Sequence, residues 1–82
     1  MAKVIIYVTS WCPHCKKLRN FLDENEIEYV DYDVESDDMA WREAMKKAGG
    51  RDIVPVIDID GKVFYGAFND ALAEKLKKAL RL

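Results

Sequence analysis

Cys12 and Cys15 are the only cysteines of this 82-residue chain, and two residues separate them. Two thiols at this spacing can form a disulfide by exchange with another disulfide and release it again. A β-branched and aromatic run at residues 4–8 precedes the pair, and apolar residues at helical spacing follow it. A Cys-x-x-Cys at such a strand-to-helix junction is typical of a thiol–disulfide redox site.

The first cysteine is the predicted nucleophile. Pro13 suits the first position of a helix, because its fixed φ is helical and its missing N–H is not needed there. Cys12 is then the N-cap, and we expect its sulfur to face the free N–H groups of His14 and Cys15. These donors and the helix dipole stabilise a thiolate. Cys15 lies one turn later and points inward, which predicts the less accessible, resolving thiol.

The cysteine pair has three alternative roles. A closed structural zinc site usually takes four ligands, and the motif adds only His14 to the two cysteines. A structural disulfide across so short a loop would stabilise a fold little. Two inert, buried cysteines would not explain a proline placed between them to start a helix. We therefore expect no metal and predict redox chemistry.

The residues around the cysteines can tune them. His14, when protonated, could stabilise the Cys12 thiolate and make the disulfide more oxidising. A neutral, exposed histidine with little effect fits the sequence equally well. Trp11 is a large apolar residue in the loop before Cys12, where we expect it to be exposed or half-exposed. Lys16 and Lys17 lie within a turn of Cys12 and could attract an anionic thiol substrate.

The length and composition predict one small domain, residues 1–82. Hydrophobic residues make up 50% of the chain, enough for a modest core, and a net charge of −2 does not indicate nucleic-acid binding. No stretch approaches the ~20 apolar residues of a membrane span. Met1-Ala2-Lys3 leads directly into the first predicted strand rather than into a signal peptide. We expect a cytoplasmic monomer whose disulfide is transient and catalytic.

The hydrophobic pattern predicts seven elements in the order β-α-β-α-β-β-α. The N-cap of the second helix is expected at Asp37 or Asp38, and that of the last helix at Asn69 or Asp70. Gly49-Gly50 ends the second helix, and Asp60-Gly61 is a hairpin turn. The predicted strands span residues 3–8, 28–34, 53–59 and 62–65, and the first helix runs from residue 13 to about residue 25.

This order predicts an α/β fold in which a central four-stranded mixed sheet is flanked by helices on both faces. The two αβ crossovers predict parallel strands with right-handed connections. The hairpin adds an antiparallel edge strand. Trp41 and Met45 lie on one face of the second helix with Ala44 and Ala48, and we expect them in the core.

Four features together resemble the glutaredoxin family: the strand–Cys-Pro-x-Cys–helix, Val54-Pro55 opening the third strand, the following Asp-Gly, and Gly66 before a capped last helix. The chain is most similar to short prokaryotic glutaredoxin-like proteins, over essentially its whole length. The resemblance implies a thioredoxin-like fold and a thiol–disulfide oxidoreductase that reduces protein or glutathione mixed disulfides without a tightly bound cofactor. It also implies that Pro55 is a cis proline facing the cysteines, so that the backbone of Val54 pairs with an extended substrate.

The same resemblance implies that glutathione is bound at Gly66 and at the start of the last helix, where Asn69 or Asp70 would meet its ammonium group. The chain departs from the family here. Glutaredoxins usually carry Lys or Arg three residues before the first cysteine, where this chain has Thr9, and Phe68 is bulkier than the family pattern. We therefore expect glutathione to bind weakly.

Two other functions stay open. The departure at Thr9 favours a dedicated electron donor that is reduced by thioredoxin reductase rather than by glutathione. Some glutaredoxins that this chain resembles instead bridge an iron–sulfur cluster between two protomers through the first cysteine and glutathione. Pro13 stiffens the loop after Cys12 and disfavours that role.

Overall fold

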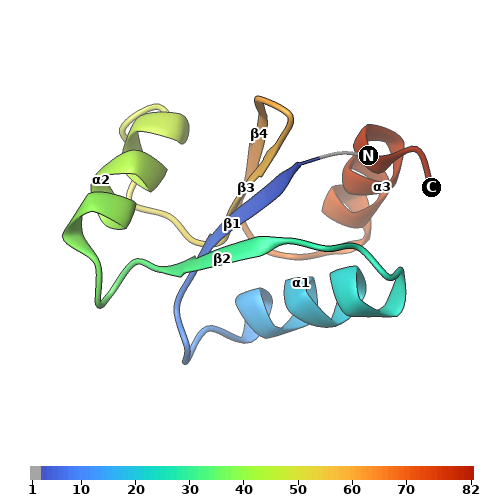
Figure 1. The fold of residues 1–82 in the computed structure, drawn as a ribbon, viewed down its shortest axis with the longest axis horizontal. Coiled ribbons are helices and arrows are strands. Elements are labelled where there is room, and N and C mark those ends of the chain that lie inside the picture. The colour runs from blue at the N-terminus through green and yellow to red at the C-terminus, as the bar shows by residue number, and fades with distance from the viewer. Residues whose placement is uncertain (1–2) are drawn as a thin grey trace.

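A computed structural model describes residues 3–82 of the chain (Figure 1). Met1 and Ala2, which contributed to the expectation that there is no export signal, lie outside the described residues. The predicted order of elements is confirmed. The elements are β1 (Val4–Val8), α1 (Pro13–Glu24), β2 (Val30–Asp33), α2 (Asp38–Lys47), β3 (Val56–Ile59), β4 (Lys62–Tyr65) and α3 (Asp70–Leu80).

The four strands form one mixed sheet in the order β2-β1-β3-β4. β1 and β2 pair in parallel, and β3 and β4 form the predicted antiparallel hairpin. The expectation that the second crossover also joins parallel strands is wrong, because β3 runs antiparallel to β1. The helix α2 lies toward the end of the sheet at which β2 finishes, and the chain enters β3 from that same end (Figure 1).

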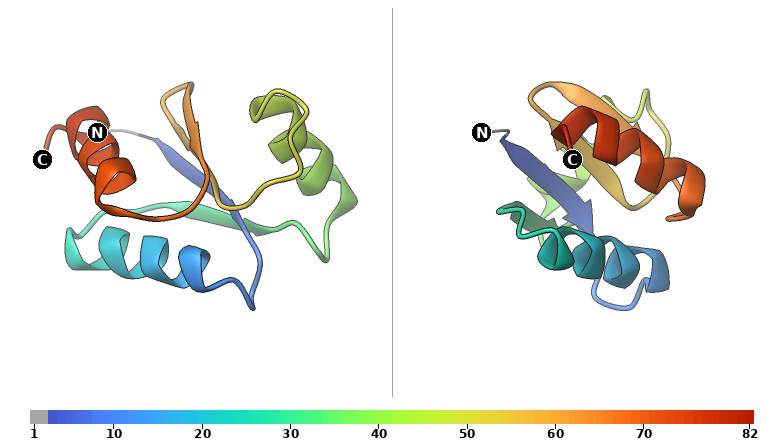
Figure 2. Two further views of the ribbon diagram at one scale, coloured as in Figure 1. Left: turned by 180° about the vertical axis from the view of Figure 1, so that it is seen from behind. Right: turned by 90° about the vertical axis from the view of Figure 1, so that its right-hand side faces the viewer.

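The helices cover both faces of the sheet, as predicted (Figure 2). α1 and α3 share one face, and α2 covers part of the other. Alternation along β1 sends Ile6 and Val8 toward α1 and α3 and sends Tyr7 toward α2. The larger core contains the buried side chains Val4, Ile6, Val8, Cys12, Cys15, Leu18, Leu22, Ile57, Ile59, Leu72 and Leu76.

The structure decides between the alternative helix caps. Asp37, rather than Asp38, caps α2, and its carboxylate accepts hydrogen bonds from the N–H groups of Met39 and Ala40 at 3.0 and 3.2 Å. Asn69, rather than Asp70, caps α3 and accepts from the N–H of Leu72 at 2.9 Å. The cap of α3 therefore lies four residues after the end of β4, which fixes where the connecting segment stops.

Three strands are shorter than predicted, and β1 begins at Val4 rather than at residue 3. β2 spans Val30–Asp33 rather than residues 28–34, and all four of its residues are exposed at the edge of the sheet. β3 begins at Val56 rather than at residue 53, since Pro55 has no N–H to give to the sheet. Residues 53–55 thus form a loop that leads into β3 and are not part of the sheet.

A charged cluster lies on the face of the sheet that α2 covers. The Lys47 ammonium on α2 is 2.7 Å from a carboxylate oxygen of Asp58 and 2.8 Å from the hydroxyl of Tyr7. The hydrogen bond from Lys47 is the main cause that holds the pKa of Asp58 below its ordinary value. Burial is the main cause that raises the pKa of Tyr7. This cluster joins α2 to the two central strands.

Among residues 3–82, no helix has both the length and the apolar character needed to cross a membrane.

Candidate redox site

The cysteine pair lies at the connection between β1 and α1 and in the first turn of α1. Cys12 has an extended backbone (φ −79°, ψ 119°) and is the N-cap of α1, with Pro13 as the first helical residue. The predicted position is therefore confirmed. The predicted bond from a backbone N–H to its sulfur is wrong for the thiol seen here, because the Cys12 side chain makes no capping hydrogen bond. A neutral thiol is a weak hydrogen-bond acceptor.

The two thiols differ in depth as predicted. Both are free thiols, Cys12 is 7% exposed and Cys15 is 1% exposed. Burial is the largest cause that raises the pKa of Cys15, to about 11, and the neighbouring Cys12 adds to the rise. Cys15 is therefore protonated at neutral pH. This is the state expected of a resolving thiol, which reacts only after the first thiol has attacked.

Thr9 lies beside Cys15, a placement that was not predicted from the sequence. It is 5% exposed, and its hydroxyl has no hydrogen-bond partner within the described chain. Its backbone and hydroxyl nonetheless lie close enough to Cys15 to favour the thiolate, and they lower the pKa of Cys15 against the effect of burial. The usable signal was its position just after β1, at the end of the sheet where α1 begins.

His14 and Trp11 flank the pair in different ways. Trp11 is 68% exposed, which confirms the expectation for this loop. His14 is half-buried, and its Nδ1 atom accepts a hydrogen bond from the backbone N–H of Phe68 at 3.2 Å. No local pattern pointed to this contact, because 54 residues separate its two partners.

The proline loop reaches the same region. The Val54–Pro55 peptide bond is cis, as the family resemblance implied. Val54 packs against the buried cluster that contains Cys12 and Cys15. Within residues 3–82, neither the N–H nor the C=O of Val54 takes part in a backbone hydrogen bond. Its polar groups thus remain for pairing with another chain.

The segment between β4 and α3 completes the site. Gly66 has φ 112°, a conformation that L side chains rarely adopt, and its N–H donates to the carbonyl of Pro55 at 3.2 Å. The backbone N–H of Phe68 donates to His14, and the side chain of Asn69 accepts from the N–H of Leu72 as the cap of α3. The structure therefore brings the predicted residues of the motif, the proline loop and this segment together.

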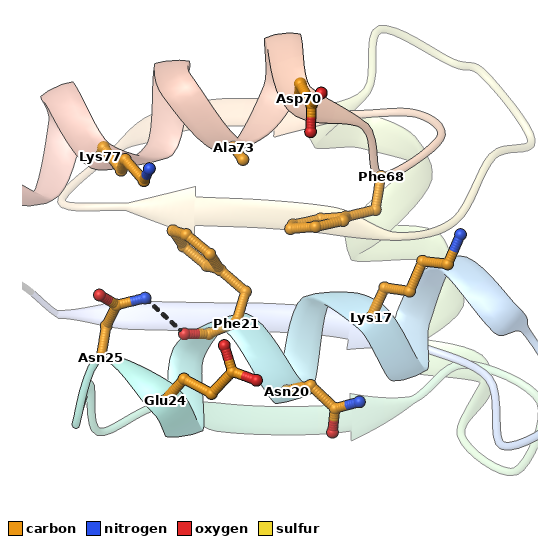
Figure 3. Close-up of a pocket in the computed structure, with 9 residues that line it drawn as sticks. All are labelled: Lys17, Asn20, Phe21, Glu24, Asn25, Phe68, Asp70, Ala73 and Lys77. Carbon is orange, nitrogen blue, oxygen red and sulfur yellow. Dashed lines mark hydrogen bonds between the residues drawn. The ribbon is translucent and has the colours of Figure 1, made fainter.

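A groove of about 450 Å³ runs between α1 and α3, and the sequence did not predict it (Figure 3). The rings of Phe21 and Phe68 meet in it at a centroid distance of 5.6 Å and an angle of 53°. Figure 3 shows Lys17 beside Phe68 at one end and Lys77 toward the other end. The other lining residues are Asn20, Glu24, Asn25, Asp70 and Ala73.

The two free cysteines supply thiol chemistry to the site. Across the part of the chain that the structure describes, no three His, Cys, Asp or Glu side chains come together as metal ligands. The guanidinium of Arg51 lies 5.6 Å from the centre of the ring of Tyr65, which is 39% exposed.

Comparison with known proteins agrees with this geometry. The sequence model of the glutaredoxin family matches residues 4–64, which include both cysteines and Pro55. A glutaredoxin-like 8.6 kDa protein of the rubredoxin operon of Clostridium pasteurianum is 45% identical over 71 residues, covering 87% of this chain and 92% of that protein.

Solved structures show the same thioredoxin-like fold. The glutaredoxin grx-1 of Archaeoglobus fulgidus superposes with a TM-score of 0.82 at 26% identity, covering 100% of this chain and 89% of that one. The thioredoxin-like protein BC3987 superposes with a TM-score of 0.77 at 30% identity, covering 94% and 99% of the two chains. This chain, with its paired thiols at the start of α1, belongs to the glutaredoxin family of thiol–disulfide oxidoreductases.

Proposed function

We propose that this protein reduces disulfides in proteins, and mixed disulfides with glutathione, by dithiol exchange through its Cys-Pro-His-Cys motif. The observation that carries the proposal is the pairing of a thiol at the N-terminus of α1 with a deeper thiol one turn later. An N-terminal helix position favours a thiolate, and the thiolate is the attacking species.

The exchange proceeds in two steps. The Cys12 thiolate attacks one substrate sulfur, a Cys12–substrate disulfide forms, and the second substrate sulfur leaves as a thiolate that takes up a proton. Cys15 then loses its proton and attacks Cys12, which releases the first substrate sulfur. Two electrons pass from the enzyme dithiol to the substrate disulfide, and the enzyme is left with a Cys12–Cys15 disulfide.

Val54 supports the alignment of the substrate. Its backbone N–H and C=O have no backbone partner in the described chain, and its side chain packs against the cluster of the two cysteines. An extended substrate segment can therefore pair with Val54 in the manner of an added strand. Such pairing recognises the backbone and tolerates many side chains, which suits a reductase of several protein substrates.

The Cys12–Cys15 disulfide must be reduced again by a second reductant. We propose that glutathione acts slowly, because groups expected to hold it already have partners within the chain. The N–H of Gly66 donates to Pro55, the N–H of Phe68 donates to His14, and the carboxamide of Asn69 caps α3. These contacts favour the alternative that a reductase of the thioredoxin-reductase type supplies the electrons.

Coupled assays with each electron source separate the two reductants. The oxidised protein would be given NADPH with glutathione and glutathione reductase in one assay, and NADPH with thioredoxin reductase in the other, with insulin as the disulfide substrate. Turnover in either assay, lost in Cys12→Ser, supports the oxidoreductase. A wild-type protein that is inactive with both reductants and also fails to reduce insulin when pre-reduced would refute the proposal.

A further inference from the structure

We infer that His14 is a positioning residue of the substrate site. Through its Nδ1 atom it holds the segment of residues 66–69 against the dithiol motif, and so sets the affinity for the disulfide substrate. The inference rests on the proposed function and deepens it, since it concerns recognition and not the exchange chemistry.

The contact joins two parts of the chain that nothing local brings together. The backbone N–H of Phe68 donates to Nδ1 of His14 at 3.2 Å, between residues 54 positions apart. Both residues are partly buried. A partly buried amide that loses its acceptor is left incompletely solvated, and this cost favours the position of the segment beside His14.

The segment is attached on both sides. At its start, the N–H of Gly66 donates to the carbonyl of Pro55 at 3.2 Å. At its end, Asn69 caps α3. Between them, Phe68 is held by His14 through its backbone and by Phe21 through its ring. His14 therefore supplies the hydrogen bond that links the segment to the helix carrying the cysteines, while Gly66 links it to the proline loop.

The contact also defines the state of the imidazole. An atom that accepts a hydrogen bond from an N–H carries no proton, so the neutral ring holds its proton on Nε2. Stabilisation of the Cys12 thiolate by a positive charge would require both ring nitrogens to be protonated. The positioning role and the charge role thus need different states of the same ring, and substitutions can separate them.

The expected consequence is a change in affinity. A recognition surface that is ordered before binding loses less freedom when the substrate arrives. The backbone of Cys12 and its place before Pro13 do not depend on the His14 side chain. Removing the Nδ1 acceptor should therefore raise the substrate concentration at half-saturation and leave the limiting rate of attack near its wild-type value.

The experiment uses single-turnover oxidation, so that no external reductant enters. Protein reduced with dithiothreitol and desalted is mixed with excess insulin over a range of concentrations, quenched with acid and alkylated, and the oxidised fraction is measured by mass spectrometry. Three variants are compared with the wild type. His14→Phe keeps a ring without the acceptor, His14→Leu removes both, and His14→Asn places an amide oxygen close to the position of Nδ1.

We expect half-saturation to rise about fivefold in His14→Phe and His14→Leu, the factor of one neutral hydrogen bond, with a limiting rate within about twofold. His14→Asn should restore half-saturation to within about twofold of the wild type. In the same proteins, the amide proton of Phe68 should exchange with solvent faster in the two acceptor-free variants and regain protection in His14→Asn, as NMR would show.

The outcomes distinguish the possible failures. An active wild type whose half-saturation is unchanged in His14→Phe and His14→Leu overturns the inference alone. A His14→Asn variant that stays as impaired as His14→Phe, with a slower limiting rate in both, assigns His14 to charge on Cys12 and also overturns it. A wild type that is not oxidised by insulin refutes the proposed function, and the recognition role falls with it.

Discussion

The hydroxyl of Thr9 and the sulfur of Cys15 lie side by side in the interior, and the hydroxyl has no hydrogen-bond partner in the described chain. Thr9 favours ionisation of Cys15, whereas burial opposes it and raises the pKa of Cys15 to about 11. The resolving step needs the Cys15 thiolate. The buried Thr9 hydroxyl, which has no other partner in the described chain, is thus available to donate a hydrogen bond to the Cys15 sulfur when it becomes negative.

Thr9→Val should slow the resolving step by about three- to tenfold, because it removes this donor while keeping the side-chain shape. Thr9→Ser keeps the hydroxyl and should remain near the wild-type rate. Rapid acid quenching after mixing with oxidised glutathione, followed by mass spectrometry, would follow the mixed disulfide at Cys12. A Val variant that resolves as fast as the Ser variant would show that the hydroxyl takes no part.

Cys12→Ser should abolish exchange, whereas Cys15→Ser should still attack a disulfide and then stall as a mixed disulfide. The reason is that Cys12 lies at the N-cap of α1, which favours its thiolate, whereas Cys15 is only 1% exposed and cannot readily reach a substrate. Iodoacetamide labelling of the reduced wild type at mildly acid pH, followed by peptide mapping, should place the label on Cys12. Preferential labelling of Cys15 would reverse the assignment.

The ionisation of Cys15 can be measured directly in Cys12→Ser. Absorbance of the thiolate near 240 nm should stay low through neutral pH and rise only in strongly alkaline solution, since burial remains the largest cause that raises the pKa of Cys15 to about 11. Loss of the Cys12 thiol removes a smaller contribution, so the midpoint should move down somewhat. Unfolded protein in urea is the control, with a midpoint at roughly 8.5. Equal midpoints in the two states would contradict the buried position.

Glutathione should bind Cys15→Ser weakly, in the millimolar range, with amide shifts at Val54, Gly66 and Asp70 followed by NMR. One missing charge contact with the ligand, where Thr9 replaces a cation, costs on the order of 1 kcal/mol and weakens binding by several-fold without abolishing it. Absence of shifts at these positions at millimolar glutathione would leave the reductase-coupled donor as the better assignment.

Lys47→Met should lower the free energy of unfolding by about 2 kcal/mol, because it leaves the largely buried Asp58 carboxylate without its cation. Asp31→Asn is the control, since its ion pair with Arg19 is exposed and should contribute less than about 1 kcal/mol. Urea denaturation measures both. Equal costs for the two changes would contradict the buried character of the cluster.

The same cluster predicts a pH dependence. The pKa of Asp58 is lowered in the folded state, so its contribution is fully present above the unfolded value of roughly 4 and is lost as the pH falls through the folded value. The stability difference between wild type and Asp58→Asn should therefore shrink on acidification below about pH 4. A difference that stays constant in that range would show that Asp58 is not shifted.

The sequence by itself determined the features that depend on neighbours within a turn or two. Pro13 placed the start of α1 and made Cys12 its N-cap, and the periodicity of apolar residues gave the order of the elements. Asp60 and Gly61 both have positive φ in the hairpin, as the turn dipeptide predicted. Such patterns are readable because they act on the backbone locally, through allowed φ values, helix caps and alternation along a strand.

Only the tertiary structure decided what depends on the packing of distant elements. The direction of β3 follows from where α2 lies, and no residue in β3 encodes it alone. The contact of Thr9 with Cys15 and the bond from Phe68 to His14 arise because α1, the end of β1 and the segment before α3 converge at one end of the sheet. Side-chain partners of this kind are selected by which buried polar groups remain to be satisfied once the elements have packed, and this is a property of the assembled fold.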